Sequence, residues 1–537
     1  MSEPTHDFTL TASDLDQIRR HGLDADEVRR QLSLLERGAR PVRLDRPCRV
    51  GDGVVRLEPA RHRELEARYN AARRDGRFAK MVPASGAATR MFRELLGALD
   101  PSGDGSANEA AVRFLDDLPR LPFVATVEDT AARHGLDVAA LRARRSADAA
   151  RPLLEVLLLD GPADGSLSNA PYLGYAQRPK ALIPFHRGAG EERTPLAEHL
   201  DEAAEHLLDH ERRAVVHFTI PQHSELDFRD AARAVEARLE RVHGARFEIS
   251  FSIQRPETDT VAGSADGGPL RDADGRLLFR PGGHGSLLPN LEAMAGDLVF
   301  VRNIDNVLPI HRRDEVLAWN RRLGGLLVEI EEFIHDTSHA IEAGRLDGDA
   351  VDRALRRSAE LLQAPHALAA LELPESERPG RLAMILDRPL RVAGVVPVAG
   401  EPGGGPFWAA SPAHAGASAG TVPVTPQIVE SAQIDRDDPA QNAVVAAATH
   451  FNPVHMVCRL RDHHGRPYPL QDFVDPETFF VTRKSHHGQP LLALEHPGLW
   501  NGAMAGWNTV FVEIPGTIFA PVKTVFDLLR PSHQPAP

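Results

Sequence analysis

The first seventy residues alternate apolar and charged positions with the spacing of amphipathic helices. Two segments, SDLDQIRRHG (13–22) and DADEVRRQLSLLERGA (24–39), carry apolar residues three or four positions apart and end at glycine or another small residue. Ser13 and Asp24 stand at their starts, where a side-chain oxygen can cap the first turn of a helix. The pattern predicts an N-terminal helical segment over residues 1–70.

Beyond residue 70, short apolar runs alternate with helical patterns. Strands are predicted for RFAKMVP, AVVHFTI, RFEISFSIQ and DLVFVRNI, which are residues 77–83, 214–220, 246–254 and 297–304. Helices are predicted at 90–99, 224–244 and near 286–295, and the stretch after residue 310 is mostly helical in pattern. This alternation indicates an α/β fold, with ligands expected outside the carboxyl ends of its strands.

A segment rich in glycine, alanine and proline interrupts the C-terminal part of the chain at residues 399–426. Its composition predicts a loop, either a flexible linker or a cover over an active site. Strand-like patterns return after it.

The bulk composition excludes some classes of protein. A net charge of −14 argues against a general nucleic-acid binder, although a small phosphorylated ligand needs only a few cations. No apolar run approaches the length of a membrane span, and the N-terminus lacks the pattern of a secretion signal. The two cysteines, Cys48 and Cys458, stand in no zinc-binding spacing. We expect a reduced cytoplasmic protein.

Lysine is rare in this chain. Of 62 basic residues only four are lysines, at Lys80, Lys180, Lys484 and Lys523, and the others are arginines. Arginine therefore supplies the general surface charge. The few lysines are candidates for places that require a compact ammonium group on a flexible stem.

Three stretches combine residue types that suit phosphate chemistry. MVPASGAATRMF (81–92) runs from a strand through a small-residue loop toward a helix, which presents backbone N–H groups to an anion. FRPGGHGSL (279–287) would allow close backbone approach to a base or ribose. In VFVRNIDNV (299–307), Asp305 follows a strand and suits Mg²⁺. Each stretch also has a purely structural explanation. The first can be a tight turn without a ligand, the second a bulge or turn, and the third an Asx-turn. Signatures of serine hydrolases, zinc proteases and kinases are absent from the sequence.

Taken in chain order, these stretches and others resemble the UDP-sugar pyrophosphorylase family of nucleotidyltransferases. The matching segments are ASGAATRM, QRPKALIPF, SFSIQRPETDT, RPGGHGSLL, VRNIDNV, IVESAQI, THFNPV and FAPVKTVFDLL, spread over residues 78–530. The last is the most specific. The whole chain also resembles a bacterial family known only as a domain of unknown function, which implies no activity.

The resemblance implies a GT-A-like, Rossmann-related mixed sheet flanked by helices, and a Mg²⁺-dependent reaction. An NTP, UTP by preference, and a sugar 1-phosphate would give an NDP-sugar and pyrophosphate. The implied triphosphate residues are Ala84, Ser85, Gly86, Ala87, Ala88 and Thr89; the implied base and ribose residues are Gln254, Gly282, Gly283, His284 and Gly285. Arg90, Lys180 and Lys523 would be the catalytic cations, Asp305 the metal ligand, and Asn303, Asn306, Glu430 and Asn452 the substrate contacts.

The same resemblance implies four consecutive parts. These are the helical segment 1–70, a nucleotide-binding core at 71–310 with residues 100–170 as an insertion, a helical connecting subdomain at 311–380, and a C-terminal part at 381–537 that completes the sugar and phosphate site. The partners would be the nucleotide and the sugar phosphate, with no nucleic acid and no membrane. The oligomeric state stays open.

The chain departs from the family pattern in two places. Ninety positions separate Arg90 from Lys180, which makes Lys180 the weakest of the implied assignments, and alanine and serine stand where the family's phosphate loop carries more glycine. The altered loop favours the alternative, a catalytically silent regulatory protein that binds a nucleotide or nucleotide sugar, whereas the retention of Asp305, Lys180 and Lys523 favours the enzyme. A glycosyltransferase of the same fold is a third hypothesis, against which the FAPVKT segment argues.

Overall fold

The computed structural model describes residues 10–100, 105–162, 170–188, 190–264, 268–398, 404–410, 423–486 and 489–535. The chain forms two compact units, and neither is continuous in sequence. Unit 1 comprises Met1–Ala79, Gln254–Val301 and Arg321–Gly516, and unit 2 comprises Lys80–Ile253, Arg302–Asn320 and Thr517–Pro537. Each unit is therefore assembled from segments that lie far apart along the chain.

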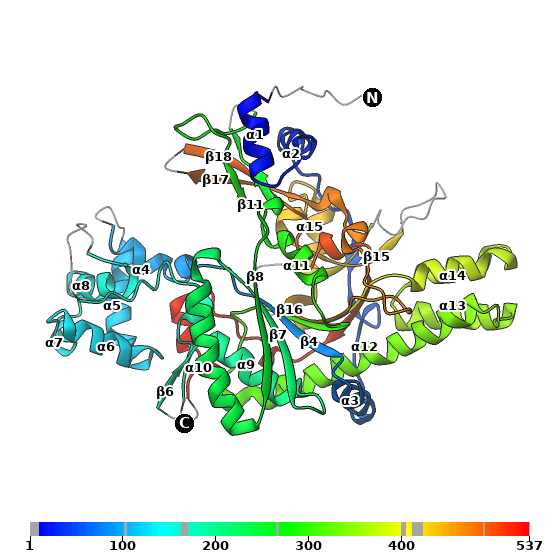
Figure 1. Ribbon diagram of the computed structural model, residues 1–537, viewed down its shortest axis with the longest axis horizontal. Coiled ribbons are helices and arrows are strands. Elements are labelled where there is room, and N and C mark those ends of the chain that lie inside the picture. The colour runs from blue at the N-terminus through cyan, green and yellow to red at the C-terminus, as the bar shows by residue number, and fades with distance from the viewer. Residues whose placement is uncertain are drawn as a thin grey trace. The chain divides into compact units, whose positions relative to one another are not determined.

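A nine-stranded mixed sheet is the main β element, and Figure 1 labels four of its strands, β4, β7, β8 and β16. Its strand order is β2 (Arg49–Val50), β3 (Gly53–Val55), β19 (Asn508–Glu513), β13 (Leu390–Pro397), β16 (His450–Arg459), β12 (Leu298–Arg302), β4 (Phe78–Pro83), β7 (Arg213–Ile220) and β8 (Arg246–Ile253). Strand β13 is parallel to β19 and antiparallel to β16, and β7 is parallel to β8. Helices flank the strands. The predicted α/β class with a mixed sheet is confirmed, while its assignment as GT-A-like stays a prediction.

Unit 1 contains most of the strands. Its helices are α1 (Ala12–Arg20), α2 (Ala25–Arg37), α3 (Pro59–Arg74), α11 (Leu288–Glu292), α13 (Gly348–Leu361), α14 (Arg378–Leu386), α15 (Pro439–Ala446) and most of α12 (Arg313–Glu342). Its strands are β1 (Leu44–Pro47), β2 (Arg49–Val50), β3 (Gly53–Val55), β9 (Asp259–Val261), β10 (Gly263–Ser264), β11 (Phe279–Pro281), β13 (Leu390–Pro397), β14 (Gly405–Ala410), β15 (Val424–Val429), β16 (His450–Arg459), β17 (Phe480–His486), β18 (Gln489–Glu495) and β19 (Asn508–Glu513). Strand β12 (Leu298–Arg302) ends at the first residue of a unit 2 segment.

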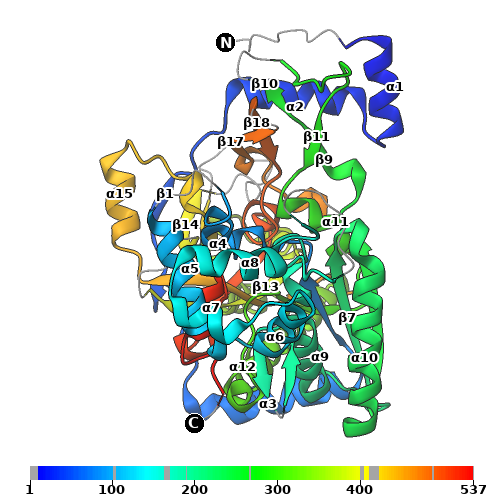
Figure 2. The same ribbon diagram turned by 90° about the vertical axis from the view of Figure 1, so that its left-hand side faces the viewer.

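The two predicted N-terminal helices are confirmed as α1 and α2. Asp24 caps α2 as predicted, through a hydrogen bond from the Asp26 N–H, but the cap of α1 is Thr11 and not Ser13. The apolar faces of both helices pack on strands β9, β11, β17 and β18 (Figure 2), around buried residues that include Leu32, Val261 and Leu494. The N-terminal helices are thus an integral part of unit 1.

The prediction of a loop at 399–426 is wrong for two stretches. Residues Gly405–Ala410 and Val424–Val429 form an antiparallel pair, β14 and β15, and Phe407 and Trp408 are buried in it. Pairing and burial outweigh the turn-rich composition here. The remaining central residues of this stretch, 399–403 and 411–422, lie outside the described part of the chain.

The helical character predicted for residues after 310 is confirmed. Helix α12 is 30 residues long and is followed by α13 and α14, which pack on each other. Among the described residues, no helix combines the length and the apolar character that a bilayer crossing would require.

Unit 2 holds the α/β arrangement expected from the sequence. Its elements are β4 (Phe78–Pro83, shared with unit 1), α4 (Arg93–Gly97), α5 (Gly105–Asp117), α6 (Val124–Arg133), α7 (Val138–Arg144), α8 (Ala147–Leu158), β5 (His186–Gly188), β6 (Glu191–Arg193), α9 (Pro195–His206), β7 (Arg213–Ile220), α10 (Glu225–His243) and β8 (Arg246–Ile253). The β7–α10–β8 succession agrees with its prediction, and Gly244, with a φ of +58°, ends α10 in the left-handed conformation.

Helices α5 to α8 form a compact helical group within unit 2 (Figure 1). Their apolar faces enclose a core that includes Phe114, Leu153 and Phe185. The chain's C-terminal stretch contributes Val525 and Leu528 to the same core. The helical group therefore anchors the segment that carries Lys523.

Candidate active site

Asp305 lies just beyond the end of β12, in a turn closed by the bond from the Asn306 N–H to the Asn303 carbonyl (3.3 Å). All five residues of β12 are buried. The Asp305 side chain is only 10% exposed. A carboxylate so placed requires a cation, because burial without a partner is costly.

Two lysines supply that cation. The ammonium groups of Lys180 and Lys523 lie 3.1 and 3.0 Å from Oδ2 of Asp305. Burial disfavours the carboxylate, but the two positive charges outweigh it and hold the pKa of Asp305 below its ordinary value. The structure thus brings together three predicted site residues from distant parts of the sequence, all within unit 2.

The two lysines differ in exposure. Lys180 is 13% exposed and also donates to the carbonyl of Val522 at 3.0 Å, whereas Lys523 is 62% exposed. Lys180 is therefore held by two acceptors in the protein. The ammonium group of Lys523 stays accessible from solvent.

The segment around Lys523 is locked by one carboxylate that the sequence analysis did not single out. Asp527 Oδ2 accepts hydrogen bonds from the N–H groups of Lys523 and Thr524, at 2.8 and 2.7 Å. With Thr524 it forms a capping box at the start of a short helical turn. The T-x-x-D spacing inside FAPVKTVFDLL is the sequence signal that would have identified it.

Asp305 and its neighbour also hold this C-terminal segment through backbone bonds. The Val522 N–H donates to the Asp305 carbonyl at 3.1 Å, and the Ala520 N–H donates to the buried Asn306 side-chain oxygen at 3.0 Å. The side chain of Asn306 is therefore engaged in bracing the segment that delivers Lys523.

The small-residue loop after β4 is fastened at both ends and open in the middle. Ala84 and Ala88 donate their N–H groups to the carbonyls of Thr219 (2.8 Å) and Arg178 (3.0 Å). Between them Ser85, Gly86 and Ala87 are exposed, and within the described chain their N–H groups have no hydrogen-bond acceptor. Three unused backbone donors in a row are a suitable cradle for an anion.

The same loop positions Lys180. The Lys180 N–H donates to the Gly86 carbonyl at 3.1 Å, and the Thr89 hydroxyl donates to the Ala176 carbonyl at 3.0 Å. Although ninety residues separate Arg90 from Lys180 in sequence, the loop and the Pro179–Lys180 segment are paired backbone to backbone.

The helix expected from Arg90 begins later. Residues Ala88–Arg90 form a 3₁₀ turn and α4 starts at Arg93, because the bonds of Ala88 and Thr89 to residues 176–178 hold the loop instead. Arg90 is exposed, and its guanidinium makes no hydrogen bond within the described residues. Any anion held here would therefore rely on loop N–H groups and side-chain cations and not on a helix N-terminus.

A buried ionic layer supports the Asp305 turn from within unit 2. Arg302 donates to the Asn306 carbonyl and to Glu202, both at 3.3 Å, and His199 Nε2 donates to the Asn303 carbonyl at 3.2 Å. Lys80 Nζ lies 3.1 Å from Glu202 and is fully buried. Burial lowers the pKa of Lys80 to about 8, against the attraction of Glu202.

The predicted base and ribose residues lie in unit 1. Gln254 donates to Asp259 Oδ1 at 3.0 Å, and the other oxygen of Asp259 lies 2.9 Å from His21 Nε2. His284 stacks on Trp500 with ring centroids 4.1 Å apart, and its Nδ1 accepts the Leu499 N–H.

The predicted sugar contacts lie in unit 1 as well. Oε1 of Glu430 lies 3.5 Å from His284 Nε2 and accepts a hydrogen bond from Asn501 at 3.1 Å. The side-chain oxygen of buried Asn452 accepts the N–H of Val454, which has a φ of +54°. Asn452 therefore supports an uncommon backbone conformation two residues further on.

The glycines of the 282–285 loop are explained by contacts inside unit 1. A Cβ on Gly282 would lie 2.7 Å from the Thr258 carbonyl oxygen, and one on Gly285 would lie 2.1 Å from that of Pro497. Gly283 has a φ of +78°. Neighbouring backbone therefore requires glycine here even without a ligand.

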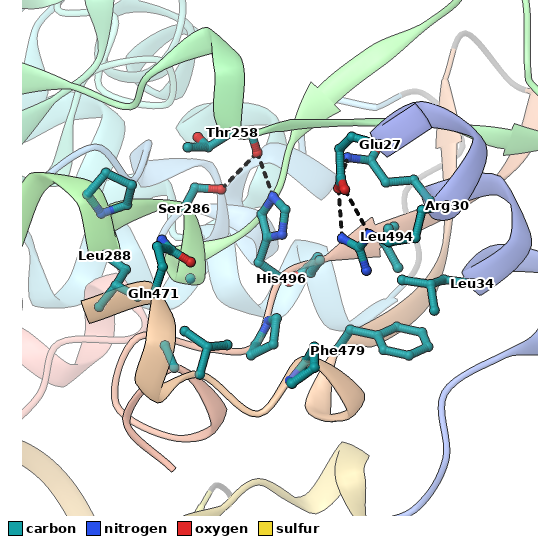
Figure 3. Close-up of a pocket in the computed structure, with 18 of the residues that line it drawn as sticks. Glu27, Arg30, Leu34, Thr258, Ser286, Leu288, Gln471, Phe479, Leu494 and His496 are labelled. Atoms are coloured by element: carbon teal, nitrogen blue, oxygen red, sulfur yellow. Dashed lines mark hydrogen bonds and ion pairs between the residues drawn. The ribbon is translucent and has the colours of Figure 1, made fainter. Parts of the chain in front are cut away.

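Beside this loop lies a cavity of about 410 Å³, entirely within unit 1 (Figure 3). Its wall includes Gly285, the ion-paired Glu27 and Arg30 of α2, and Ser286 and His496, which both contact the Thr258 carbonyl. Its size falls within the usual range of small-molecule pockets. Gln254 and Glu430 are not among the residues that line this cavity.

Asp305 fits the Mg²⁺ that the family resemblance implies. Both lysines contact Oδ2, and Oδ1 accepts no hydrogen bond within the described residues. Magnesium sites in nucleotide enzymes commonly use one or two carboxylates and take further ligands from phosphates and water. One available carboxylate oxygen beside two cations suits such a site.

The structure of this chain is similar to solved structures of two pyrophosphorylases. Its structure is similar to that of the UDP-N-acetylglucosamine pyrophosphorylase from Trypanosoma brucei, at 12% identity and a TM-score of 0.48, over 97% of this chain and 82% of that one. It is also similar to the UDP-glucose pyrophosphorylase from Leishmania major, at 13% identity and a TM-score of 0.43, over 97% and 79%. No curated protein matches the sequence.

A family model covers nearly the whole sequence. The family described as "Domain of unknown function (DUF4301)" matches residues 11–534. The predicted resemblance to an uncharacterised family is thereby confirmed. The chain belongs to the DUF4301 family.

Proposed function

We propose that this protein is a Mg²⁺-dependent nucleotidyltransferase that makes a nucleotide sugar. It joins the nucleotidyl group of an NTP, UTP by preference, to a sugar 1-phosphate. An oxygen of the sugar phosphate bonds to the α-phosphorus, the bond to the β-phosphate's bridging oxygen breaks, and pyrophosphate leaves. The observation that carries the proposal is the convergence of Lys180, Asp305 and Lys523 within unit 2.

This reaction asks for charge compensation and positioning more than for proton transfer. The attacking oxygen is already anionic, so neither a general base nor a covalent nucleophile is needed. Lys180, held by Asp305 and the Val522 carbonyl, supplies a fixed charge. Lys523, largely exposed, supplies one that can follow the transferring phosphate.

The open loop gives the phosphates a second set of contacts. The N–H groups of Ser85, Gly86 and Ala87 bind non-bridging oxygens of the triphosphate, and Arg90 adds a guanidinium at the end of the loop. Mg²⁺, when bound at Asp305, offsets the negative charge of the phosphate oxygens. In unit 1, we assign base and ribose binding to Gln254 and the 282–285 loop.

Sugar recognition is assigned to Glu430 and Asn452. Glu430 accepts hydrogen bonds from the Asn501 side chain and from the Gln433 N–H, and the remaining lone pairs of its carboxylate can accept a sugar hydroxyl. Asn452 uses its oxygen for the Val454 N–H, which leaves its amide N–H groups as the donors for the sugar.

One feature favours the alternative function, a nucleotide-sugar binding protein without turnover. Both lysines neutralise the same oxygen of the single carboxylate, so the charges of the cluster already satisfy one another in the absence of a ligand. Such a closed cluster is what a ligand-binding regulatory protein would retain.

The test is pyrophosphate release by the purified full-length chain with Mg²⁺. Each NTP is paired with a panel of sugar 1-phosphates, and the nucleotide sugar is identified by mass spectrometry. We expect release with at least one pair, with loss of release in EDTA. Nucleotide-sugar binding by calorimetry without release for any pair would overturn catalysis and support the alternative. Failure of both turnover and binding would reject both functions.

A further inference from the structure

A cluster of histidines in unit 1 stands apart from all residues assigned above. His335, His339 and Glu342 follow one another at spacings of four and three, so they share one face near the end of α12. His463 and His464 lie in the turn that follows β16. The fold places it against the helix.

The contacts within the cluster are close. The Nε2 atoms of His463 and His464 lie 2.8 and 3.0 Å from Oε1 of Glu342. Ring centroids of His339 lie 5.2 and 5.4 Å from those of His463 and His464. The Glu342 carboxylate thus lies in direct contact with both imidazoles of the turn.

We propose that His339, Glu342 and His464 form a binding site for a divalent transition-metal ion of the Zn²⁺ type. Their ligand atoms all lie within 4.8 Å of one another. In a tetrahedral zinc site the ligand atoms are about 3.4 Å apart, given bonds of about 2.0–2.1 Å. Nε2 of His464 lies 3.0 Å from Oε1 of Glu342, and Nδ1 of His339 lies 3.8 Å from Oε2 of Glu342. Both separations are near the tetrahedral value, and the partial exposure of all three side chains permits the remaining adjustment.

The donor set decides the class of metal. Two imidazoles and one carboxylate suit Zn²⁺, Ni²⁺ or Cu²⁺, whereas Mg²⁺ and Ca²⁺ prefer oxygen ligands alone. His463 lies on the same carboxylate oxygen as His464 and is placed to supply a fourth ligand. This site differs in chemistry from the Asp305 cluster and does not depend on the proposed reaction.

Hydrogen bonds within the turn fix its conformation without a metal. Asp462 Oδ1 accepts the N–H groups of His464 and Arg466, each at 2.9 Å, and Gly465 has a φ of +79°. A metal bound between helix and turn would crosslink residues 122 positions apart in sequence. We therefore expect the ion to stabilise unit 1 rather than to take part in catalysis.

The experiment uses full-length protein without a histidine tag, stripped with a chelator and dialysed. Zn²⁺ is titrated in competition with a chromophoric chelator, and Co²⁺ reports geometry through its visible absorption. We expect one ion per chain with a Kd of about 1 μM or below. Zn²⁺ should also raise the thermal unfolding midpoint by several degrees, because it binds only the folded chain.

Variants separate this site from scattered surface histidines. Glu342→Gln and the double change His339→Ala with His464→Ala should weaken Zn²⁺ binding at least tenfold and remove the thermal shift. Both should melt like the wild type without metal, since the altered side chains are partly exposed. His210→Ala, which removes an exposed histidine elsewhere, should change neither. Any of three results would overturn the site: an unchanged Zn²⁺ affinity in the double variant, an equal loss of Zn²⁺ affinity in His210→Ala, or binding of less than one ion per chain.

Discussion

Two loops rich in small residues, one in each unit, look alike in sequence and differ in structure. In the 84–89 loop of unit 2, a Cβ added to Gly86 would meet nothing within 4 Å, and the neighbouring N–H groups are unused. In the 282–285 loop of unit 1, a Cβ on Gly285 would lie 2.1 Å from a backbone oxygen. One loop is open toward solvent, and the other is closed by its own neighbours.

The difference shows that glycine can occur in such a loop for two separate reasons. In the closed loop, packing against residues 495–497 demands glycine whether or not a ligand binds. In the open loop no contact within the described residues demands glycine at Gly86. The proposed approach of a triphosphate to the backbone would account for it, so this loop offers the more direct test of that proposal.

Gly285→Ala should have the largest effect of any change considered. The added methyl overlaps the Pro497 carbonyl, and the backbone must shift to relieve the clash. We expect a fall in the thermal unfolding midpoint of ten degrees or more, or insoluble protein. A melting curve like that of the wild type would show that the closed loop yields easily.

Asp305→Asn should nearly abolish turnover while the chain still folds. It leaves two ammonium groups beside a neutral amide and removes the metal ligand, and we expect a loss on the order of 10³-fold. Pyrophosphate release measures it. The control is Asp52→Asn, which removes a carboxylate paired with Arg46 in unit 1. This variant should keep full activity.

Lys523→Arg should lower turnover roughly 10- to 100-fold with little change in stability. A planar guanidinium cannot occupy the place of a compact ammonium between a carboxylate and a phosphate. Lys484→Arg, at a half-buried lysine paired with Glu495 (2.7 Å), is the matched control. Equal activities of the two variants would remove Lys523 from the site.

Gly86→Ala should separate binding from folding in the open loop. Since its Cβ meets no protein atom, the unfolding midpoint should stay within about 1 °C of the wild type. The KM for the NTP should rise about tenfold, because the methyl group keeps the triphosphate away from the backbone. An unchanged KM would mean that the loop does not approach the nucleotide.

The smallest expected effect is a pH dependence of stability. Because the folded-state pKa of Asp305 is lowered, its contribution is present above its ordinary value near 3.9 and is lost as the pH falls through the folded-state pKa. The difference in unfolding midpoint between wild type and Asp305→Asn should be largest above pH 5 and shrink below pH 4. A difference that does not change with pH would contradict the ion-pair account.

Much of the local structure followed from the sequence. The helices α1, α2 and α10 and the strands β4, β7, β8 and β12 lie where the apolar pattern predicts them, since that pattern is written locally within each element. Strands β14 and β15 were missed, because glycine, alanine and proline around Phe407 hid a pairing that tertiary contacts create. The cap of α1 was misplaced by two residues for a similar local reason, a reciprocal bond between Thr11 and Asp14.

The sequence predicted the residues of the candidate site but not how they contact one another. Lys180, Asp305 and Lys523 were singled out by motif and by the rarity of lysine, but their contact could not be read from positions 125 and 218 residues apart. Asp527 was overlooked although its T-x-x-D spacing from Thr524 is a capping signal, because such a spacing indicates a helix start and no ligand.

By itself, the sequence determined the α/β class, and it supplied the candidate residues of the proposed phosphate site in their chain order. Periodicity and turn chemistry are local properties, and each is written within a few residues. Only the tertiary structure decided that Lys180 and Lys523 share one carboxylate oxygen, that Gly86 is open while Gly285 is closed, and that a turn after β16 meets the end of α12. These outcomes depend on which distant segments pack together, and that is settled by the burial of the whole chain rather than by any stretch of it.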